Sequence, residues 1–285
     1  MKRNTLIAVA ILCLSLSSGK AQQWVEQGFG LLPVKYGVFD ISIVDEQIIW
    51  AVAFDHDIIF TGIPEEHIIV VLRTLNGGES WELVEVDEAV GRASFDIEAI
   101  NDSTAFITTN DFNNGKGRGV FKTTDGGQSW EEIFHDVSAG VWLRFFGPEE
   151  AIVINARGMA STKDGGVSWQ TLELDSLNGF LEDEATLISS SNTSLEKIGN
   201  TLWFGTSRGR VFRSQDKGQH WEVYDTPFRD SAAILSISFL DSLNGMIVTG
   251  FGPVTELART KDGGETWTKV VPDVEARLTM VSFIP

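Results

Sequence analysis

Cysteine and basic residues are scarce in this sequence of 285 residues. Its single cysteine, Cys13, excludes an intramolecular disulfide and paired-cysteine redox chemistry. The 22 Lys and Arg residues face 40 Asp and Glu residues, which gives a formal net charge of −18. We therefore exclude nucleic acid as a partner, because neutralising phosphates requires a surplus of basic side chains. Hydrophobic residues make up 42%, so the chain has enough apolar side chains for a folded core.

Long hydrophobic runs are also missing, with one exception at the start of the chain. Lys2 and Arg3 precede an apolar run at 6–16, and Gly19-Lys20-Ala21 offers the small residues that a signal peptidase reads. We predict a signal peptide over 1–21 and a single mature domain over 22–285. No later stretch approaches the roughly 18 to 20 apolar residues of a membrane span. We expect a soluble bacterial protein of the periplasm or the extracellular space.

One sequence box is repeated five times and decides the predicted architecture. The box runs from a Thr or Ser through Asn or Asp and Gly to a Trp, and its copies are Thr74–Trp81, Thr123–Trp130, Thr162–Trp169, Ser214–Trp221 and Thr260–Trp267. The tryptophans are 49, 39, 52 and 46 residues apart. This period is typical of one four-stranded blade of a β-propeller. Short β-rich runs lie between the boxes, and no segment keeps a long helical apolar period, so we expect little or no helix.

Each box has the composition of a tight turn. Asp or Asn followed by Gly favours a hairpin, because the side chain caps turn amides and Gly accepts a positive φ. The box resembles the Asp-box, or BNR, repeat of the sialidase-like propellers. The residues to which we assign this structural role are Asn76, Trp81, Asp125, Trp130, Asp164, Trp169, Asp216, Trp221, Asp262 and Trp267. Lys217 and His220 depart from the pattern, so we expect weaker local bonding in the fourth box.

The strand pattern around the boxes extends beyond five complete repeats. If the box joins the third and fourth strands of a blade, then 23–26 matches an outermost strand and 278–284 matches an innermost strand. The sequence thus predicts an all-β propeller with five complete four-stranded blades, an additional N-terminal outer strand and an additional C-terminal inner strand. We expect six or seven blades in an intact relative, because open sheet edges favour aggregation.

A further stretch, 191–214 followed by 233–250, is similar to secreted bacterial relatives of the photosystem II stability and assembly factor. This resemblance implies a monomeric, non-catalytic propeller that binds or helps to assemble other proteins. Its ligand would be a protein segment or an anionic or glycan ligand. It implies no cofactor and no metal, and the sequence has no dinucleotide fingerprint or haem motif.

A glycoside hydrolase is the alternative, since sialidases and some xyloglucan hydrolases also carry such boxes. A sialidase needs a tyrosine nucleophile and an Arg-Ile-Pro motif; this chain has only Tyr36 and Tyr224 and lacks the motif. A mechanism with two carboxylates stays open, because their separation decides it. The candidate acids on predicted loops are Asp55, Asp57, Asp111 and Glu182.

The residues that we expect to bind a partner are three arginines before successive boxes, Arg118, Arg157 and Arg208. They would form a basic arc on the face opposite the boxes, suited to a carboxylate or an acidic segment. Solvated turn residues are the alternative interpretation. The group Asp55, His56, Asp57 and His67 resembles metal ligands only loosely. The long connection 175–193 is a candidate partner surface.

Overall fold

The computed structural model describes residues 31–32, 35–55, 57–111, 117–136, 141–155, 158–186, 194–250, 255–271 and Val281. The predicted signal peptide and N-terminal outer strand lie outside these residues, as does all of 278–284 except Val281. The described part forms five four-stranded antiparallel sheets, each built from strands consecutive in the sequence. The prediction of five complete blades is therefore confirmed.

The strands of the five blades follow in chain order. Blade 1 contains β1 (Tyr36–Ile43), β2 (Ile49–Asp55), β3 (Ile69–Thr74) and β4 (Glu82–Val86). Blade 2 contains β5 (Ala93–Ala99), β6 (Ala105–Asn110), β7 (Arg118–Thr123) and β8 (Glu131–Asp136). Blade 3 contains β9 (Val141–Phe145), β10 (Ala151–Asn155), β11 (Gly158–Thr162) and β12 (Gln170–Glu173). Blade 4 contains β13 (Leu195–Ile198), β14 (Thr201–Gly205), β15 (Arg210–Ser214) and β16 (Glu222–Asp225), and blade 5 contains β17 (Ala233–Phe239), β18 (Gly245–Gly250), β19 (Leu257–Thr260) and β20 (Thr268–Val270).

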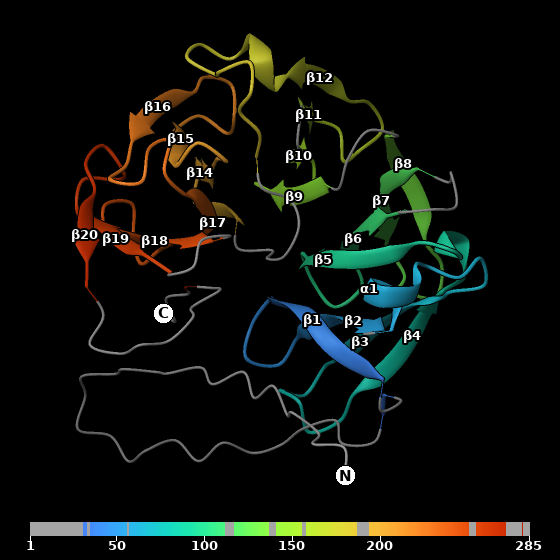
Figure 1. Cartoon of the computed structure of the whole chain (residues 1–285). Helices are drawn as coiled ribbons and strands as arrows, with labels where there is room; N and C mark the ends of the chain where they lie inside the picture. Colours follow the sequence, from blue (N-terminus) through green and yellow to red (C-terminus); the bar gives the residue numbers. More distant parts are fainter. Residues whose placement is uncertain are drawn as a thin grey trace.

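The five blades follow one another around an arc, from blade 1 in blue to blade 5 in red (Figure 1). The first strand of each blade lies toward the centre and the fourth lies at the outside. Helix is limited in the described residues to α1 (Ile58–Thr61) and the 3-10 turns η1 (Asp87–Ala89) and η2 (Leu174–Ser176). No helix in these residues is long and apolar enough to cross a membrane.

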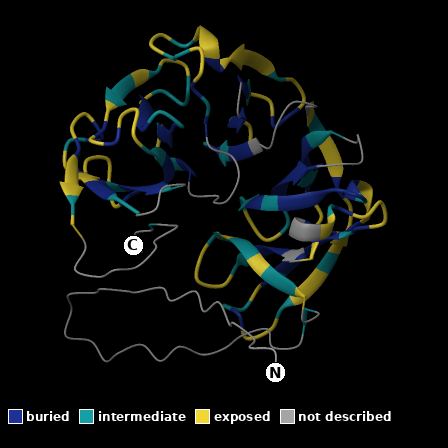
Figure 2. Cartoon of the chain, in the orientation of Figure 1, coloured by how far each residue is buried: buried dark blue, intermediate teal, exposed yellow. Residues whose placement is uncertain are grey.

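The hydrophobic core lies between neighbouring blades. Between blades 1 and 2, for example, Trp50 and Val71 pack in one cluster with Ile107 and Phe121. Further clusters join blade 2 to blade 3, blade 3 to blade 4 and blade 4 to blade 5. Buried residues accordingly concentrate on the second and third strands of the blades, while the fourth strands are largely exposed (Figure 2). Each blade therefore depends on its neighbours for its apolar burial.

The boxes form the turns between the third and fourth strands. In the second box, the Thr123 hydroxyl donates to Asp125 Oδ1 at 2.8 Å and accepts the Gly127 N–H at 2.9 Å. Asp125 Oδ1 also accepts the Ser129 N–H at 3.0 Å, and the Ser129 hydroxyl donates to Asp125 Oδ2. Donation by Ser129 lowers the pKa of Asp125 to about 2. Gly127 has φ 92°, and a Cβ there would lie 2.7 Å from Val84 of blade 1, so the position requires glycine.

The fourth box keeps this hydrogen-bonding scheme, so the expected weakening of its local bonding is wrong. Ser214 Oγ accepts the Gly218 N–H at 2.8 Å, and Asp216 Oδ1 accepts the His220 N–H at 2.8 Å. His220 Nδ1 lies 2.6 Å from Asp216 Oδ2 and takes the place of the hydroxyl in the other boxes. Lys217 occupies the first glycine position with φ 61°, a left-handed conformation that non-glycine residues seldom adopt.

The ring of Trp130 packs in the cluster between blades 1 and 2 and is 5% exposed. We predict that Trp130→Ala lowers the free energy of unfolding by about 3 to 5 kcal/mol, because truncation leaves a cavity. Urea denaturation measures the change. Val167→Ala is the matched control, since Val167 lies in the next box and is 87% exposed. Equal stabilities for the Trp130 variant and the parent would show that the ring does not contribute to the core.

Candidate functional site

The predicted basic arc lies on the face opposite the boxes, where the second and third strands of each blade are joined. Arg118 is the first residue of β7, opposite Asp136 of β8. Arg208 lies in the turn between β14 and β15, two residues before the latter begins. The two arginines are therefore not at one equivalent position, since Arg118 precedes its box aspartate by seven residues and Arg208 precedes its own by eight. Arg157 lies outside the described residues.

Arg208 is paired with two carboxylates. Its guanidinium lies 3.0 Å from Asp183 Oδ2 and 3.5 Å from Asp230 Oδ1. A cavity of about 230 Å³ opens beside it, lined by the turn 207–208, residues 230–233 and Gly250. An incoming carboxylate would have to compete with both aspartates. Because Asp183 and Asp230 are 69% and 51% exposed, these ion pairs are solvated and weak.

The long connection between blades 3 and 4 is packed onto the turn that carries Arg208. Glu184, whose side chain is fully buried, forms an ion pair with Arg210 and accepts the Thr206 hydroxyl at 2.5 Å. Arg210 also donates to the Gly179 carbonyl at 2.7 Å. Residues 177–186 are therefore fixed to blade 4 and form a stable part of this face. Of the predicted connection 175–193, residues 187–193 lie outside the described part.

The first loop on this face contains the loosely metal-like group of the sequence. Asp55, at the end of β2, forms an ion pair with Lys35 at 2.6 Å. Although burial opposes ionisation, the hydrogen bond from Lys35 holds the pKa of Asp55 below its usual value. His67 is buried, and this burial lowers its pKa. Within the described ranges, which omit His56, no three His, Asp or Glu side chains gather as ligands of a metal ion.

The remaining acids proposed for a hydrolase do not share one environment. Asp57 and Glu182 are exposed, whereas Asp111 is buried and engaged by neighbouring groups. Asp57 belongs to the first loop, Asp111 follows β6, and Glu182 belongs to the connection between blades 3 and 4.

The inner strands are joined to one another by side chains. Each inner strand has one free edge, and in β5, β9 and β17 acceptor side chains of the preceding blade bind the backbone N–H groups of this edge. Asp40 of β1 accepts the Ile97 N–H of β5 at 2.9 Å. The same contact recurs from Ser42 to Ala99, from Asp96 to Leu143, from Glu98 to Phe145 and from Glu196 to Phe239. We call these contacts the inner-strand joints.

The last joint of the described structure involves Val281. Its backbone N–H donates to Ser236 Oγ of β17 at 3.1 Å, and its carbonyl accepts the same hydroxyl at 3.3 Å. Val281 thus occupies, beside β17, the place that Ile97 occupies beside β1. The other residues of the predicted inner strand 278–284 lie outside the described part, so that strand stays a prediction.

Blade 3 reverses the direction of its joint. Its inner strand carries Trp142 and Arg144 instead of acceptors, and Arg144 donates to the Leu195 carbonyl of β13 at 2.9 Å. The guanidinium also lies 3.1 Å from Asp96 Oδ1 of β5. Burial opposes the charge of Arg144, but Asp96 and neighbouring carboxylates raise its pKa above the usual value.

Three other carboxyl groups of the inner strands are hard to ionise. Burial raises the pKa of Glu98 and of Glu196 to about 7. Burial and the nearby charge of Asp96 raise the pKa of Asp40 to about 7. The charge of Arg144 acts on all three groups, and the charge of Lys197 acts on Glu98 and Glu196, so the cations partly offset the effect of burial.

Solved structures share this fold at low sequence identity. YCF48 bound to D1 peptide matches with a TM-score of 0.55 and 16% identity, over 84% of this chain and 82% of that chain. YCF48 from Cyanidioschyzon merolae matches with 0.52 and 15%, over 84% and 86%. The GH74 xyloglucanase from Xanthomonas campestris matches with 0.58 and 13%, over 83% of this chain but 38% of the enzyme. No family model matches the sequence, and no curated protein is detectably similar to it.

The chain has the fold of these propellers. The likeness confirms the fold that the repeated box indicated, and the similar structures include both YCF48 and a xyloglucanase. Sequence reasoning did not find the inner-strand joints or Arg144. The signal available was the recurrence of Phe39-Asp40 as Phe95-Asp96 at the same place in two blades.

The raised pKa of Glu98 predicts a specific pH dependence. Between its unfolded pKa near 4.5 and its folded pKa of about 7, the folded chain binds more protons than the unfolded chain. Its contribution to stability is therefore present at pH 4 and is lost as the pH rises toward 7. We predict that Glu98→Gln raises stability at pH 8 by on the order of 1 to 3 kcal/mol and has little effect at pH 4.

Thermal melts from pH 4 to pH 8 test this prediction. Glu131→Gln, on the exposed surface of β8, is the control and should keep the profile of the parent. A Glu98→Gln profile parallel to that of the parent would contradict the assignment.

Removal of Arg144 should leave Asp96 buried without its cation. We predict that Arg144→Met destabilises by about 3 to 5 kcal/mol at neutral pH. Adding Asp96→Asn should recover part of this loss, because the amide oxygen still accepts the Leu143 N–H. Urea denaturation of the single and double variants measures both effects. If Asp96→Asn lowers the stability of the Arg144→Met variant further, loss of the ion pair is not the cause of the destabilisation.

Proposed function

We propose that this chain is an exported, non-catalytic β-propeller that binds another protein. The observation that carries the proposal is the match to YCF48 bound to D1 peptide, which covers more than four fifths of both chains. The match to the xyloglucanase leaves most of that enzyme without a counterpart. Export rests on the predicted signal peptide at 1–21.

The face opposite the boxes is the surface that we assign to the partner. The packed connection 177–186 and the turn of Arg208 give it a fixed shape, and Arg118 adds a second cation on blade 2. Planar guanidinium groups suit carboxylates of a protein segment. The paired state of Arg208 means that a partner with several acidic side chains, rather than a single anion, would displace Asp183 and Asp230.

The states of the acids favour binding over hydrolysis. A glycosidase needs a general acid whose pKa is raised, next to a second carboxylate. Among the loop candidates, Asp55 is ionised and held by Lys35. Asp40 and Glu98, whose pKa values are raised, instead accept backbone N–H groups of the next blade, which gives them a structural role.

Affinity capture from the native envelope or culture medium tests the proposal. We predict that the chain retains a protein partner and that the triple variant Arg118→Gln, Arg157→Gln, Arg208→Gln loses at least about 90% of it, since each charge-assisted contact is worth about 1.5 to 3 kcal/mol. The control is Lys261→Gln, which removes a cation from the box face.

Two results would overturn the proposal. One is equal capture by the triple variant and the parent at low salt. The other is turnover of a sialoside or a β-glucan by the purified chain that a single substitution at Asp57, Asp111 or Glu182 abolishes.

A further inference from the structure

The spaces between consecutive blades are here called seams. On the box face, three of the four seams within the described residues are closed by a cation, which is the residue before the box and reaches from the third strand to the next blade. Arg73 of blade 1 donates to the Asp102 carbonyl of blade 2 at 2.9 Å. Lys122 of blade 2 donates to the Gly165 carbonyl at 3.2 Å, and Arg213 of blade 4 donates to the Gly263 carbonyl at 3.2 Å.

An aromatic residue of the second strand is the register partner of each of these cations. Arg73 lies over Trp50 at 5.2 Å, and Lys122 lies over Phe106 at 5.5 Å. In blade 4 the corresponding pair is Arg213 and Trp203, adjacent in the strand register. Both members of the pair are large, so together they fill the seam.

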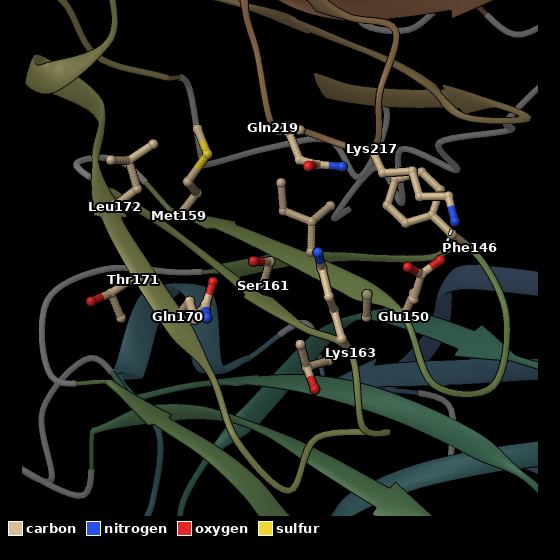
Figure 3. Close-up of a pocket in the computed structure, with 14 residues that line it drawn as sticks. Phe146, Glu150, Met159, Ser161, Lys163, Gln170, Thr171, Leu172, Lys217 and Gln219 are labelled. Carbon is tan, nitrogen blue, oxygen red and sulfur yellow. Dashed lines mark hydrogen bonds and ion pairs between the residues drawn. The ribbon is translucent and has the colours of Figure 1, made fainter.

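The seam between blades 3 and 4 lacks both large residues. Ser161 stands where the other blades have the cation, and its register partner Ile152 stands where they have an aromatic ring. A groove of about 290 Å³ opens at this place (Figure 3). Ser161 and Ile152 line it, with the outer strand β12 on one side and the fourth box on the other. The groove exists because Ser161 and Ile152 are smaller than the cation and the aromatic residue at the same positions of blades 1, 2 and 4.

The groove contains one lysine, Lys163, that has no ion-pair partner among the described residues, and it also contains apolar side chains. Lys163 is directed toward the middle of the lining residues in Figure 3, and in the described part of the chain no acid or hydrogen-bond acceptor pairs with it. The second lysine, Lys217, is already paired with Glu150. Met159 and Leu172 supply apolar surface, and Leu172 is 41% exposed.

We propose that this groove binds an extended segment of a partner polypeptide through an acidic side chain. The carboxylate pairs with Lys163, and an apolar neighbour covers Met159 and Leu172. The amides of Gln170 and Gln219, which also line the groove, are placed to bind the backbone of the segment.

The charges and the adjacent strand favour this occupant. A cationic ligand would meet Lys163 and Lys217, whereas a carboxylate meets one cation that has no partner in the described structure. Strand β12 is the edge of its sheet and all four of its residues are exposed, so an extended chain can lie beside it. The groove is on the box face, so its test is independent of the proposed partner surface on the opposite face.

Nuclear magnetic resonance of the chain with ¹³C-methylated lysines tests the proposal. The probe is acetyl-Leu-Glu-Leu-amide, and its neutral partner is acetyl-Leu-Gln-Leu-amide. We expect the acidic peptide to shift the Lys163 resonance saturably at concentrations up to about 10 mM. It should bind about two- to fivefold more tightly than the neutral peptide, as one exposed ion pair allows.

Three variants distinguish the groove from general surface charge. Lys163→Gln should remove the preference for the acidic peptide, whereas Lys261→Gln, at the same position of the fifth box, should retain it. Ser161→Arg restores the cation of the other seams and should abolish binding while the cooperative melt is kept. The proposal is overturned if no saturable shift occurs, if the two peptides bind equally, or if the Ser161→Arg variant binds as the parent does.

Discussion

The free edge of each inner strand is the constraint on which the blades depend. In a four-stranded blade the first strand pairs on one side only, and its other N–H groups face the centre of the molecule. Buried N–H groups without acceptors are costly. Side chains of the preceding blade supply these acceptors, as Asp40 does for Ile97 and Glu98 does for Phe145. The joints therefore fix the order and spacing of the blades from the centre outward.

The choice of acidic side chains for these joints has an electrostatic consequence. A carboxylate is a strong acceptor, but several of them at the centre repel each other and lose hydration. Arg144 reduces this repulsion by pairing with Asp96. Arg144 also donates a hydrogen bond to the Leu195 carbonyl of the next blade. Serine serves the same purpose without charge at Ser42 and Ser236. The inner strands thus use acceptors of two kinds, carboxylates near a buried arginine and neutral hydroxyls.

Sequence reasoning predicted the repeated architecture because a blade must make the same turn each time. The Thr, Asp and Gly of the box are local requirements of one hairpin, so they recur at readable positions. The joints and seams join residues that are 29 to 57 positions apart, and only their place in the blade relates them. The groove was equally hidden, because it results from two residues, Ser161 and Ile152, that are smaller than their counterparts in other blades. Arg208 was identified as a basic turn residue, but its partners Asp183 and Asp230 come from other connections.

Hydrogen exchange of individual backbone amides tests the inner-strand joints most directly. The amides of Ile97, Leu143 and Phe145 point away from the ladders of their own sheets, so only the joints protect them. The joints predict that these three amides exchange as slowly as the ladder amides of the same strands. They also predict that Glu98→Ala accelerates exchange at Phe145 more than at Ile97. Exchange of all three amides at the rate of exposed turn amides in the parent chain would contradict the account.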